Sequence, residues 1–357
     1  MVGAIGTYGN PGRGAHKHAM DGARCVYNGR KVVASLFGTA PQQVVFTSSA
    51  TESLNMAIMG LLSAKDHVIT TVLEHNSVLR PLYYLQSKGL DMSIIGMHQG
   101  CLDYDSFERC VRPNTRAVIV TAASNVTGLL VDLKFISNFC KRHGLLLIVD
   151  AAQTAGIIPI DMADLGISAL CFTGHKSLFG SQGVGGLCVS QQVNIMPTKF
   201  GGTGVHTFSK TQPIEMPDSL EAGTLNTPGI AGLTAGIEYI FAEGIGKIFA
   251  KAQKLAEEFY AQVSSIPSVK VYSNFSLPHV PIVTLNIGGL DSALVEHYLA
   301  NEYGISVRGG FHCAPLLHKA LGTEGQGAVR FSFSSFNTAD DVEMAVRAVR
   351  KIAMQNL

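Results

Sequence analysis

Short apolar runs rich in β-branched residues alternate with longer segments of helical periodicity between residues 44 and 190. Runs of the first kind predict buried strands, and segments in which apolar residues recur every three or four positions predict helices. We expect strands at residues 44–47, 67–72, 93–97, 117–122, 145–149, 169–172 and 186–189, and helices at 51–62, 78–89, 104–111 and 133–143. This alternation indicates an α/β domain with a mainly parallel sheet that helices cover on both faces.

The rest of the chain follows a different pattern. Residues 191–232 are rich in Gly, Pro and Thr and lack periodicity, which predicts a long functional loop. An amphipathic helix follows around residues 248–263, and further regular segments lie at 282–287, 291–302, 305–308, 329–334 and 338–352. We therefore expect residues 1–245 to form a large domain and residues 246–357 to form a smaller α+β domain.

Composition and charge narrow the class of protein. The chain has 357 residues, which is more than one compact core usually holds. Because 46% of the residues are hydrophobic and 15% are charged, the chain can bury a sizeable core. Its formal net charge of +1 gives no reason to expect nucleic acid or an anionic membrane as a partner. It contains no apolar run that could span a bilayer and no recognisable secretory signal.

The cysteine and histidine patterns indicate the compartment and argue against a metal site. The chain contains seven cysteines, an odd number, and no Cys-X-X-Cys sequence. This usage fits a reducing cytoplasm better than a disulfide framework. His16 and His18 lack third and fourth ligands at useful spacing, so we expect no metal.

Two neighbouring predicted strands end in groups that suit a specific cofactor. The strand at 145–149 leads into Asp150, and the strand at 169–172 leads towards Lys176. Ligands of parallel sheets bind at the carboxyl ends of the strands. A lysine there can hold a pyridine cofactor as a Schiff base, while the carboxylate keeps the ring nitrogen protonated. These residues predict an enzyme that uses pyridoxal 5'-phosphate.

Other strand ends carry candidate residues that also have structural interpretations. Ala50 and Thr51 begin a predicted helix, where free N–H groups would bind a phosphate, although Ser and Thr are also routine N-caps. His75 follows a strand and would lie flat on a cofactor ring, or it is simply structural. Asn125 would reach the cofactor or a substrate, or it belongs to a turn.

The C-terminal part adds a candidate nucleophile and a candidate carboxylate receptor. Cys313 stands between glycines and a proline, so we expect it on a loop, where His312 and Arg308 would favour the thiolate; the alternative is an idle surface thiol. Arg330 begins a strand and is suited to bind an amino-acid carboxylate through two hydrogen bonds, although a structural salt bridge is the commoner role.

Taken together, these segments resemble the class V aminotransferase group, and in particular the cysteine desulfurases. The resemblance extends over nearly the whole chain, from the Asn-Pro-Gly-Arg-Gly sequence at 10–14 to the Phe-Asn-Thr sequence at 336–338. Its specificity lies in the order of seven motifs, which are Ala50-Thr51-Glu52, Glu74-His75-Asn76, Ser124-Asn125, Asp150-Ala151-Ala152-Gln153, Thr173-Gly174-His175-Lys176, Glu221-Ala222-Gly223-Thr224 and Arg308 with His312-Cys313-Ala314.

The resemblance implies a pyridoxal-phosphate-dependent transferase fold of type I and a role for each matching residue. Lys176 would hold the cofactor and move the α-proton, Asp150 would pair with the pyridine nitrogen, and His75 would stack on the ring. The other implied contacts are Thr51, Thr173 and His175 for the phosphate, Gly223 and Thr224 for the phosphate in the partner subunit of a homodimer, Gln153 for the phenolic oxygen, and Asn125, Arg308 and Arg330 for the substrate.

The implied activity is conversion of L-cysteine to L-alanine, with the sulfur taken by Cys313 as a persulfide and passed to an acceptor protein. Selenocysteine lyases belong to the same branch, so L-selenocysteine is an alternative substrate, and another class V aminotransferase-type activity or a non-catalytic scaffold also stays open. Relatives usually begin with a strand and turn containing Asp-Asn-Ala-Ala-Thr, which does not precede Asn10 here. We therefore expect the N-terminal element of the large domain to be truncated.

Overall fold

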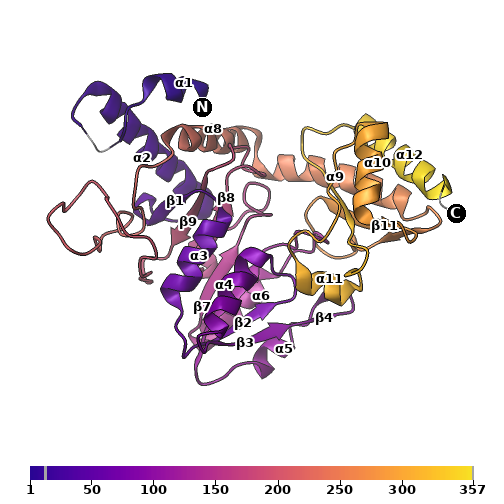
Figure 1. The fold of residues 1–357 in the computed structure, drawn as a ribbon, viewed down its shortest axis with the longest axis horizontal. Helices are drawn as coiled ribbons and strands as arrows, with labels where there is room; N and C mark the ends of the chain where they lie inside the picture. Colours follow the sequence, from indigo (N-terminus) through magenta and orange to yellow (C-terminus); the bar gives the residue numbers. More distant parts are fainter. Residues whose placement is uncertain (12–13, 356–357) are drawn as a thin grey trace.

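A computed structural model describes residues 1–11 and 14–355. Two residues of the 10–14 motif, Gly12 and Arg13, lie outside the described residues. Figure 1 shows the large sheet with its flanking helices at one end of the molecule and the C-terminal elements, in orange and yellow, at the other. No described helix has both the length and the apolar composition needed to cross a bilayer.

The large sheet has seven strands in the order β1-β9-β8-β7-β6-β2-β3. Only β9 runs in the opposite direction to the other six strands, so the sheet is mainly parallel, as the sequence predicts. The strand that differs most from its predicted range is β3, which begins two residues earlier than expected. The strands are β1 (Val44–Thr47), β2 (His67–Thr71), β3 (Asp91–Ile95), β6 (Thr115–Thr121), β7 (Leu146–Asp150), β8 (Ala169–Thr173) and β9 (Gly185–Val189).

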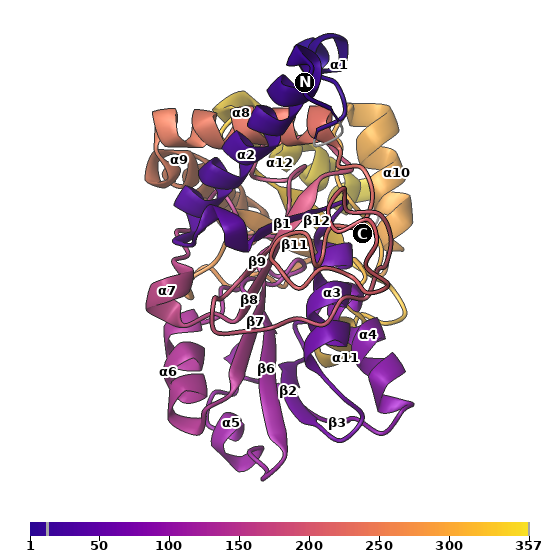
Figure 2. The same ribbon diagram turned by 90° about the vertical axis from the view of Figure 1, so that its left-hand side faces the viewer.

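Helices cover both faces of this sheet, and alternate strand residues pack into the two layers. On β7, Leu147 and Val149 belong to one apolar cluster and Ile148 to the other. The first cluster includes residues of α2 (Lys17–Phe37), α6 (Leu133–His143) and α8 (Thr227–Glu243), and the second includes residues of α3 (Ala50–Leu61) and α4 (Asn76–Gln86). Figure 2 shows α6 on one side of the sheet and α3 and α4 on the other. Short helices α1 (Val2–Thr7), α5 (Ser106–Arg109) and α7 (Met162–Leu165) and a hairpin of β4 (Met97–His98) and β5 (Cys101–Leu102) complete this part.

Two long helices, α2 and α8, were not expected from the sequence. The prediction of a loop over 191–232 is wrong at its end, because α8 begins at Thr227, where the side chain of Asn226 accepts a hydrogen bond from Gly229 N at 3.0 Å. Helix α2 packs against α8, and a Cβ at Gly29 would lie 2.6 Å from Ile230 Cγ2. Small residues permit this close contact, while Ile230, Leu233, Ile237 and Ile240 form the buried apolar stripe of α8.

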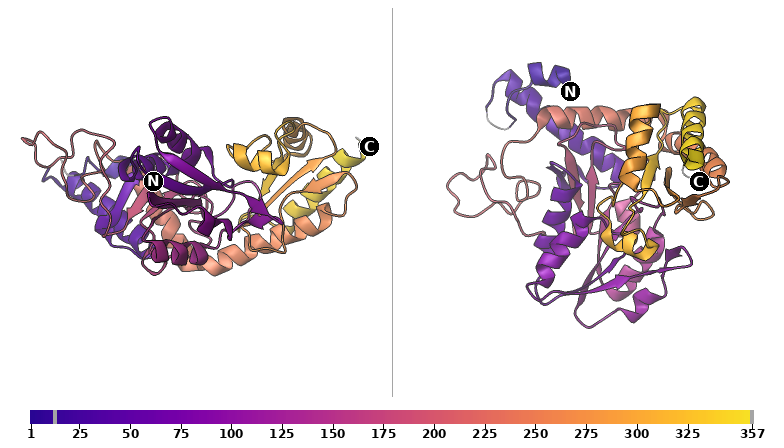
Figure 3. Two further views of the ribbon diagram at one scale, coloured as in Figure 1. Left: turned by 90° about the horizontal axis from the view of Figure 1, so that it is seen from below. Right: turned by 45° about the vertical axis from the view of Figure 1, so that its right-hand side comes forward.

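The C-terminal elements pack around a second core. A three-stranded antiparallel sheet, β10-β11-β12, lies against α9 and α12, with Phe259, Leu285 and Val349 fully buried between them. Figure 3 shows α9 extending from the large sheet towards these elements. Their bounds are α9 (Ile245–Val263), β10 (Val269–Val271), β11 (Ile282–Ile287), α10 (Ser292–Tyr303), α11 (Pro315–Leu321), β12 (Val329–Ser332) and α12 (Ala339–Gln355). The domain boundary expected after residue 245 stays a prediction, since Ile248 of α9 still packs in the large core.

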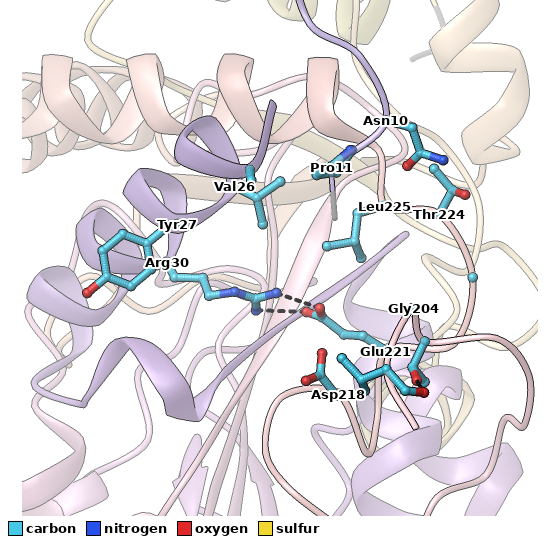
Figure 4. A pocket seen from close by; sticks show the side chains of 14 residues that line it. Asn10, Pro11, Val26, Tyr27, Arg30, Gly204, Asp218, Glu221, Thr224 and Leu225 are labelled. Carbon is cyan, nitrogen blue, oxygen red and sulfur yellow. Dashed lines mark hydrogen bonds and ion pairs between the residues drawn. The ribbon is translucent and has the colours of Figure 1, made fainter. Parts of the chain in front are cut away.

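One buried ion pair attaches the long segment between β9 and α8 to the sheet. Arg30 Nη1 and Nη2 donate to the Glu221 carboxylate at 2.8 and 2.5 Å (Figure 4). The same carboxylate accepts a hydrogen bond from Phe46 N of β1 at 2.6 Å. Both side chains are nearly inaccessible, at 10% and 4%, so the pair is desolvated and its geometry is fixed by three hydrogen bonds. Glu221 therefore anchors the chain just before Gly223 and Thr224.

Candidate active site

Asp150 and Lys176 lie at neighbouring strand ends, as the sequence predicts. Asp150 ends β7 and pairs with Cys171 of β8, and Lys176 follows β8 by three residues. Burial raises the pKa of Asp150, while hydrogen bonding to Ala152 N at 2.9 Å and the nearby Lys176 charge lower it. Desolvation lowers the pKa of Lys176, as do Arg330 and Arg308, whereas Asp150 opposes this shift. The lysine is therefore shifted towards the free amine that forms imines.

A close approach of two backbones supports the turn that carries Lys176. Gly156 has a φ of 91°, and a Cβ there would lie 2.3 Å from the carbonyl oxygen of Ser177. Only glycine permits this contact between the segment after Asp150 and the residue next to Lys176. Phe179 N donates to Lys176 O at 3.0 Å, which closes the turn. The Lys176 side chain borders a pocket of about 270 Å³ together with Gln153 and Arg330.

His75 is the N-cap of α4 and lies beside a second pocket. Its Nδ1 accepts a hydrogen bond from Ser77 N at 3.0 Å, so the neutral ring carries its proton on Nε2. Desolvation and the positive charges of Lys176, Arg308, Arg80 and Arg330 lower the pKa of His75 to about 4. The ring is consequently neutral at pH 7 and can lie against an aromatic group without the repulsion that a charged ring would add.

The N-terminus of α3 offers hydrogen-bond donors for an anion. Ser49 Oγ accepts from Glu52 N at 3.3 Å, and Glu52 Oε2 accepts from Ser48 N at 2.6 Å, so the helix start is well defined. The N–H groups of Ala50 and Thr51 have no acceptor among the described residues. A helix N-terminus with free N–H groups favours a phosphate.

Two further contacts between polar side chains belong to this group of predicted phosphate residues, one between two hydroxyl groups and one between a hydroxyl group and an imidazole. Thr51 Oγ1 lies 2.7 Å from Ser77 Oγ, which joins α3 to α4. Thr173 Oγ1 lies 3.0 Å from His175 Nδ1 at the end of β8. The predicted phosphate contacts from α3 and β8 are thus at the carboxyl edge of one sheet, whereas Gly223 and Thr224 are exposed and border a different pocket from Lys176.

Asn125 and Arg330 form a connected pair with unused hydrogen-bonding capacity. Arg330 Nη1 donates to Asn125 O at 2.8 Å, and Asn125 Nδ2 donates to His312 O at 2.7 Å. Among the described residues, the buried Asn125 Oδ1 and Arg330 Nε have no hydrogen-bond partner. Burial and the neighbouring Arg308, whose backbone pairs with Arg330, lower the pKa of Arg330 to about 10. The two guanidinium groups supply the charge that an amino-acid carboxylate requires.

Cys313 lies on a loop before α11, as expected, and is the exposed one of the seven free cysteines. Its carbonyl oxygen accepts a hydrogen bond from Asn76 N at 2.7 Å, so the loop contacts the start of α4 beside His75. Cys313, His75 and Thr51 border one pocket of about 610 Å³. By contrast, burial raises the pKa of Cys140 to about 12 and raises that of Cys171 well above its ordinary value. Those buried thiols are unsuited to act as nucleophiles.

Sequence reasoning assigned no role to Glu74, which the structure places inside the site. The side chain is fully buried, Thr71 Oγ1 donates to its Oε1 at 2.6 Å, and its Oε2 has no partner among the described residues. Burial raises the pKa of Glu74 to about 8, and Asp150 contributes to the rise. A glutamate just after an apolar parallel strand, whose carboxyl end lies at the same edge of the sheet as Asp150, is the signal that could have identified it.

The sequence profile described as "Aminotransferase class-V" matches residues 5–344. The chain belongs to this family. It is 33% identical over 352 residues to a probable cysteine desulfurase of Methanothermobacter thermautotrophicus, which covers 96% of this chain and 88% of that protein. The family resemblance predicted from the motifs is thus confirmed, and the family consists of enzymes.

Solved structures confirm the predicted fold of type I pyridoxal-phosphate-dependent transferases. An apo structure of a cysteine desulfurase from Thermococcus onnurineus is similar with a TM-score of 0.92 and 31% identity, over 99% of this chain and 91% of that one. The cysteine desulfurase CsdA from Escherichia coli, in an S-sulfonic acid form, is similar with a TM-score of 0.89 and 29% identity, over 100% and 91%.

Glu74 predicts a pH dependence of stability. Its pKa is about 8 in the folded protein against roughly 4.3 in an unfolded chain, so folding binds a proton between these values. The free energy of unfolding should therefore fall as the pH rises through this window, by about 1.4 kcal/mol per pH unit at most from this group. Urea unfolding of the cofactor-free protein at several pH values should show a smaller slope for Glu74→Gln.

The matched control is Glu258→Gln, which changes an exposed carboxylate on α9. This variant should keep the slope of the wild type. Equal slopes for the wild type and Glu74→Gln would show that Glu74 is ionised in the folded protein.

Proposed function

We propose that the protein is a pyridoxal-phosphate-dependent cysteine desulfurase, which converts L-cysteine to L-alanine and takes the sulfur onto Cys313. The observation that carries this proposal is the exposed Cys313 thiol, which shares a pocket with His75 and Thr51 next to the strand ends that carry Asp150 and Lys176. The relatives named as cysteine desulfurases support it. We also propose a cytoplasmic location, which the free cysteines support.

The residues present fit pyridoxal 5'-phosphate. Three features match its three ends: a buried carboxylate for the ring nitrogen, an amine with a lowered pKa for the aldehyde, and a helix N-terminus with free N–H groups for the phosphate. When bound, the cofactor supplies an electron-withdrawing ring that stabilises negative charge on the substrate α-carbon.

The chain's own residues bind and orient this group. Asp150, oriented by Ala152 N, would face the ring nitrogen, and the neutral His75 would lie on the ring. Lys176 would hold the aldehyde carbon and, once released by substrate, carry the α-proton. The remaining proposed contacts are the N–H groups of Ala50 and Thr51, the side chains of Thr51, Thr173 and His175 at the phosphate, and Gln153 at the phenolic oxygen.

The substrate contacts follow from the groups left without partners. Arg330 Nε and Asn125 Oδ1 would bind the carboxylate and amino ends of the amino acid, and Arg308 adds positive charge. The Cys313 thiolate would attack the substrate sulfur, so that a sulfur–sulfur bond forms as the carbon–sulfur bond breaks. The product is alanine, and the exposed persulfide is open to a sulfur-acceptor protein.

We further propose that the active unit is a homodimer. Gly223 and Thr224 are exposed and separate from the Lys176 pocket of their own chain, on a segment that projects from the body of the molecule (Figure 1). Phe200, Phe208 and Ile214 on this segment are 71%, 101% and 86% exposed, which is unusual for large apolar side chains unless a partner covers them.

The dimer gives a prediction about Thr224. Light scattering of the cofactor-bound protein should give twice the chain mass, and Thr224→Ala should weaken cofactor binding while leaving the dimer intact, because only a phosphate contact is lost. Ser209→Ala, at an exposed site on the same segment, is the control and should bind cofactor normally. A monomer that binds cofactor tightly would contradict the proposal.

Cys313 separates sulfur chemistry from selenium chemistry. A thiolate is a poor leaving group that must be taken by direct attack, whereas the more acidic selenol leaves readily. Cys313→Ala should therefore lose nearly all alanine release from L-cysteine and keep much of any release from L-selenocysteine. Both reactions should be measured under one condition, with Cys101→Ala as the control thiol. Full desulfuration of L-cysteine by Cys313→Ala would show that Cys313 is an ordinary loop thiol.

A further inference from the structure

We propose that His318 and Thr323 are positioning residues, which form a one-directional hydrogen-bonded chain with His312 and thereby fix the loop that presents Cys313. This inference rests on the proposed function of Cys313 as the sulfur acceptor. Neither His318 nor Thr323 borders the pockets that contain Lys176 or His75. Their effect would act through the conformation of the loop.

The Cys313 loop has a backbone conformation that needs external support. His312 and Cys313 have φ values of 50° and 55°, so two consecutive residues with side chains adopt the left-handed region. Such residues persist only where surrounding contacts determine them. Two of these contacts hold the carbonyl groups: Asn125 Nδ2 donates to His312 O, and Asn76 N donates to Cys313 O, both at 2.7 Å.

A third support holds the His312 side chain. His312 Nε2 lies 3.1 Å from the carbonyl oxygen of Arg308, and His312 Nδ1 lies 3.4 Å from His318 Nε2. His318 Nδ1 in turn lies 2.7 Å from Thr323 Oγ1. Hydrogen-bond contacts therefore connect the three side chains in the order Thr323, His318 and His312, and His312 connects them to the backbone of Arg308.

Burial lowers the pKa of both His312 and His318, and with both rings neutral one arrangement of protons satisfies this series. A carbonyl oxygen can only accept, so His312 Nε2 must carry a proton and its Nδ1 must accept. His318 must then donate from Nε2 and accept at Nδ1, where the Thr323 hydroxyl is the donor. Thr323 Oγ1 also lies 3.3 Å from the carbonyl oxygen of His318, but its contact with His318 Nδ1 is shorter, at 2.7 Å, and fixes the tautomer of that ring.

The surroundings match two neutral rings. His312 and His318 are 2% and 1% exposed, and their rings are nearly parallel, with 8° between the planes. Burial and the charges of Arg330 and Arg308 lower the pKa of His312 to about 4, although its contact with Arg308 O opposes this shift. Burial also lowers the pKa of His318. The rings thus stay neutral at pH 7 and the order of donors is maintained.

The chain also connects the nucleophile to the substrate contacts. His318 N donates to Ala314 O at 3.1 Å, and Thr323 N donates to His318 O at 2.9 Å. The hydrogen-bonded chain of side chains is therefore attached to the backbone of α11 and of the turn that follows it. At its other end, Asn125 binds both His312 and Arg330. A shift of His312 would therefore move the Cys313 thiol relative to the carboxylate receptor.

The test compares three substitutions in the cofactor-bound enzyme. His318→Leu removes the donor to His312, His318→Gln keeps an N–H near the position of Nε2, and Thr323→Val removes only the hydroxyl. We expect His318→Leu to lower kcat for alanine release from L-cysteine by roughly tenfold to a hundredfold, as for a misplaced reacting group, with KM little changed. His318→Gln should restore most of the rate, and Thr323→Val should show a smaller loss.

Two further readouts separate positioning from a general loss of structure. Cofactor absorbance should be unchanged in all three variants, and the acid limb of kcat should move to higher pH in His318→Leu, because His312 Nδ1 becomes free to take a proton. His279→Leu is the control, since His279 is also buried, at 5%, and hydrogen-bonded to Gln253, yet lies outside this loop. It should leave kcat and its pH profile unchanged.

The outcomes distinguish this inference from the proposed function. Wild-type kcat and pH profile in both His318→Leu and Thr323→Val would overturn the positioning role, as would an equal loss in His318→Gln. If His318→Leu fails to fold, Thr323→Val alone decides. Failure of the proposed function would give a different result, because Cys313→Ala would then release alanine from L-cysteine at the wild-type rate.

Discussion

The site depends on the pairing of the Asp150 carboxylate with the Lys176 amine at the ends of the neighbouring strands β7 and β8. Burial disfavours the charged form of each group, and each favours the charge of the other. The pairing requires parallel strands in register and a turn after β8 that the Gly156 contact holds in place. The sheet order, with β6, β7 and β8 adjacent, brings Asn125, Asp150 and Lys176 to one edge.

The charges around this pair favour anionic ligands. Arg330 and Arg308 lower the pKa of Lys176, and all three charges lower that of His75. The free N–H groups of α3 add partial positive charge. The nearby acids are buried, and the Glu74 carboxyl is protonated below about pH 8. The histidines next to the site are neutral. The charge of the site thus favours binding of a phosphate and a carboxylate. Its neutral imidazole rings can pack against an aromatic ring or take part in hydrogen bonds.

The parts predicted from the sequence are those that depend on local pattern. Asp150 and Lys176 follow apolar runs that form adjacent parallel strands, so their proximity could be inferred. Helix α8 was missed although Ile230, Leu233, Ile237 and Ile240 form its buried stripe, because the Gly, Pro and Thr content around its first turn is typical of a loop. Glu74 and His318 were missed because their roles come from burial and from partners distant in the fold, which spacing does not reveal. The roles of the site residues stay predictions until they are measured.

Titration with pyridoxal 5'-phosphate, followed by visible absorbance, tests the pairing of Asp150 and Lys176 most directly. The wild type should develop the absorbance of a protonated Schiff base, because the lysine forms the imine and the carboxylate keeps the ring protonated. Lys176→Ala should bind the cofactor without this band. A wild-type protein that stays colourless after the addition of pyridoxal 5'-phosphate would contradict the account.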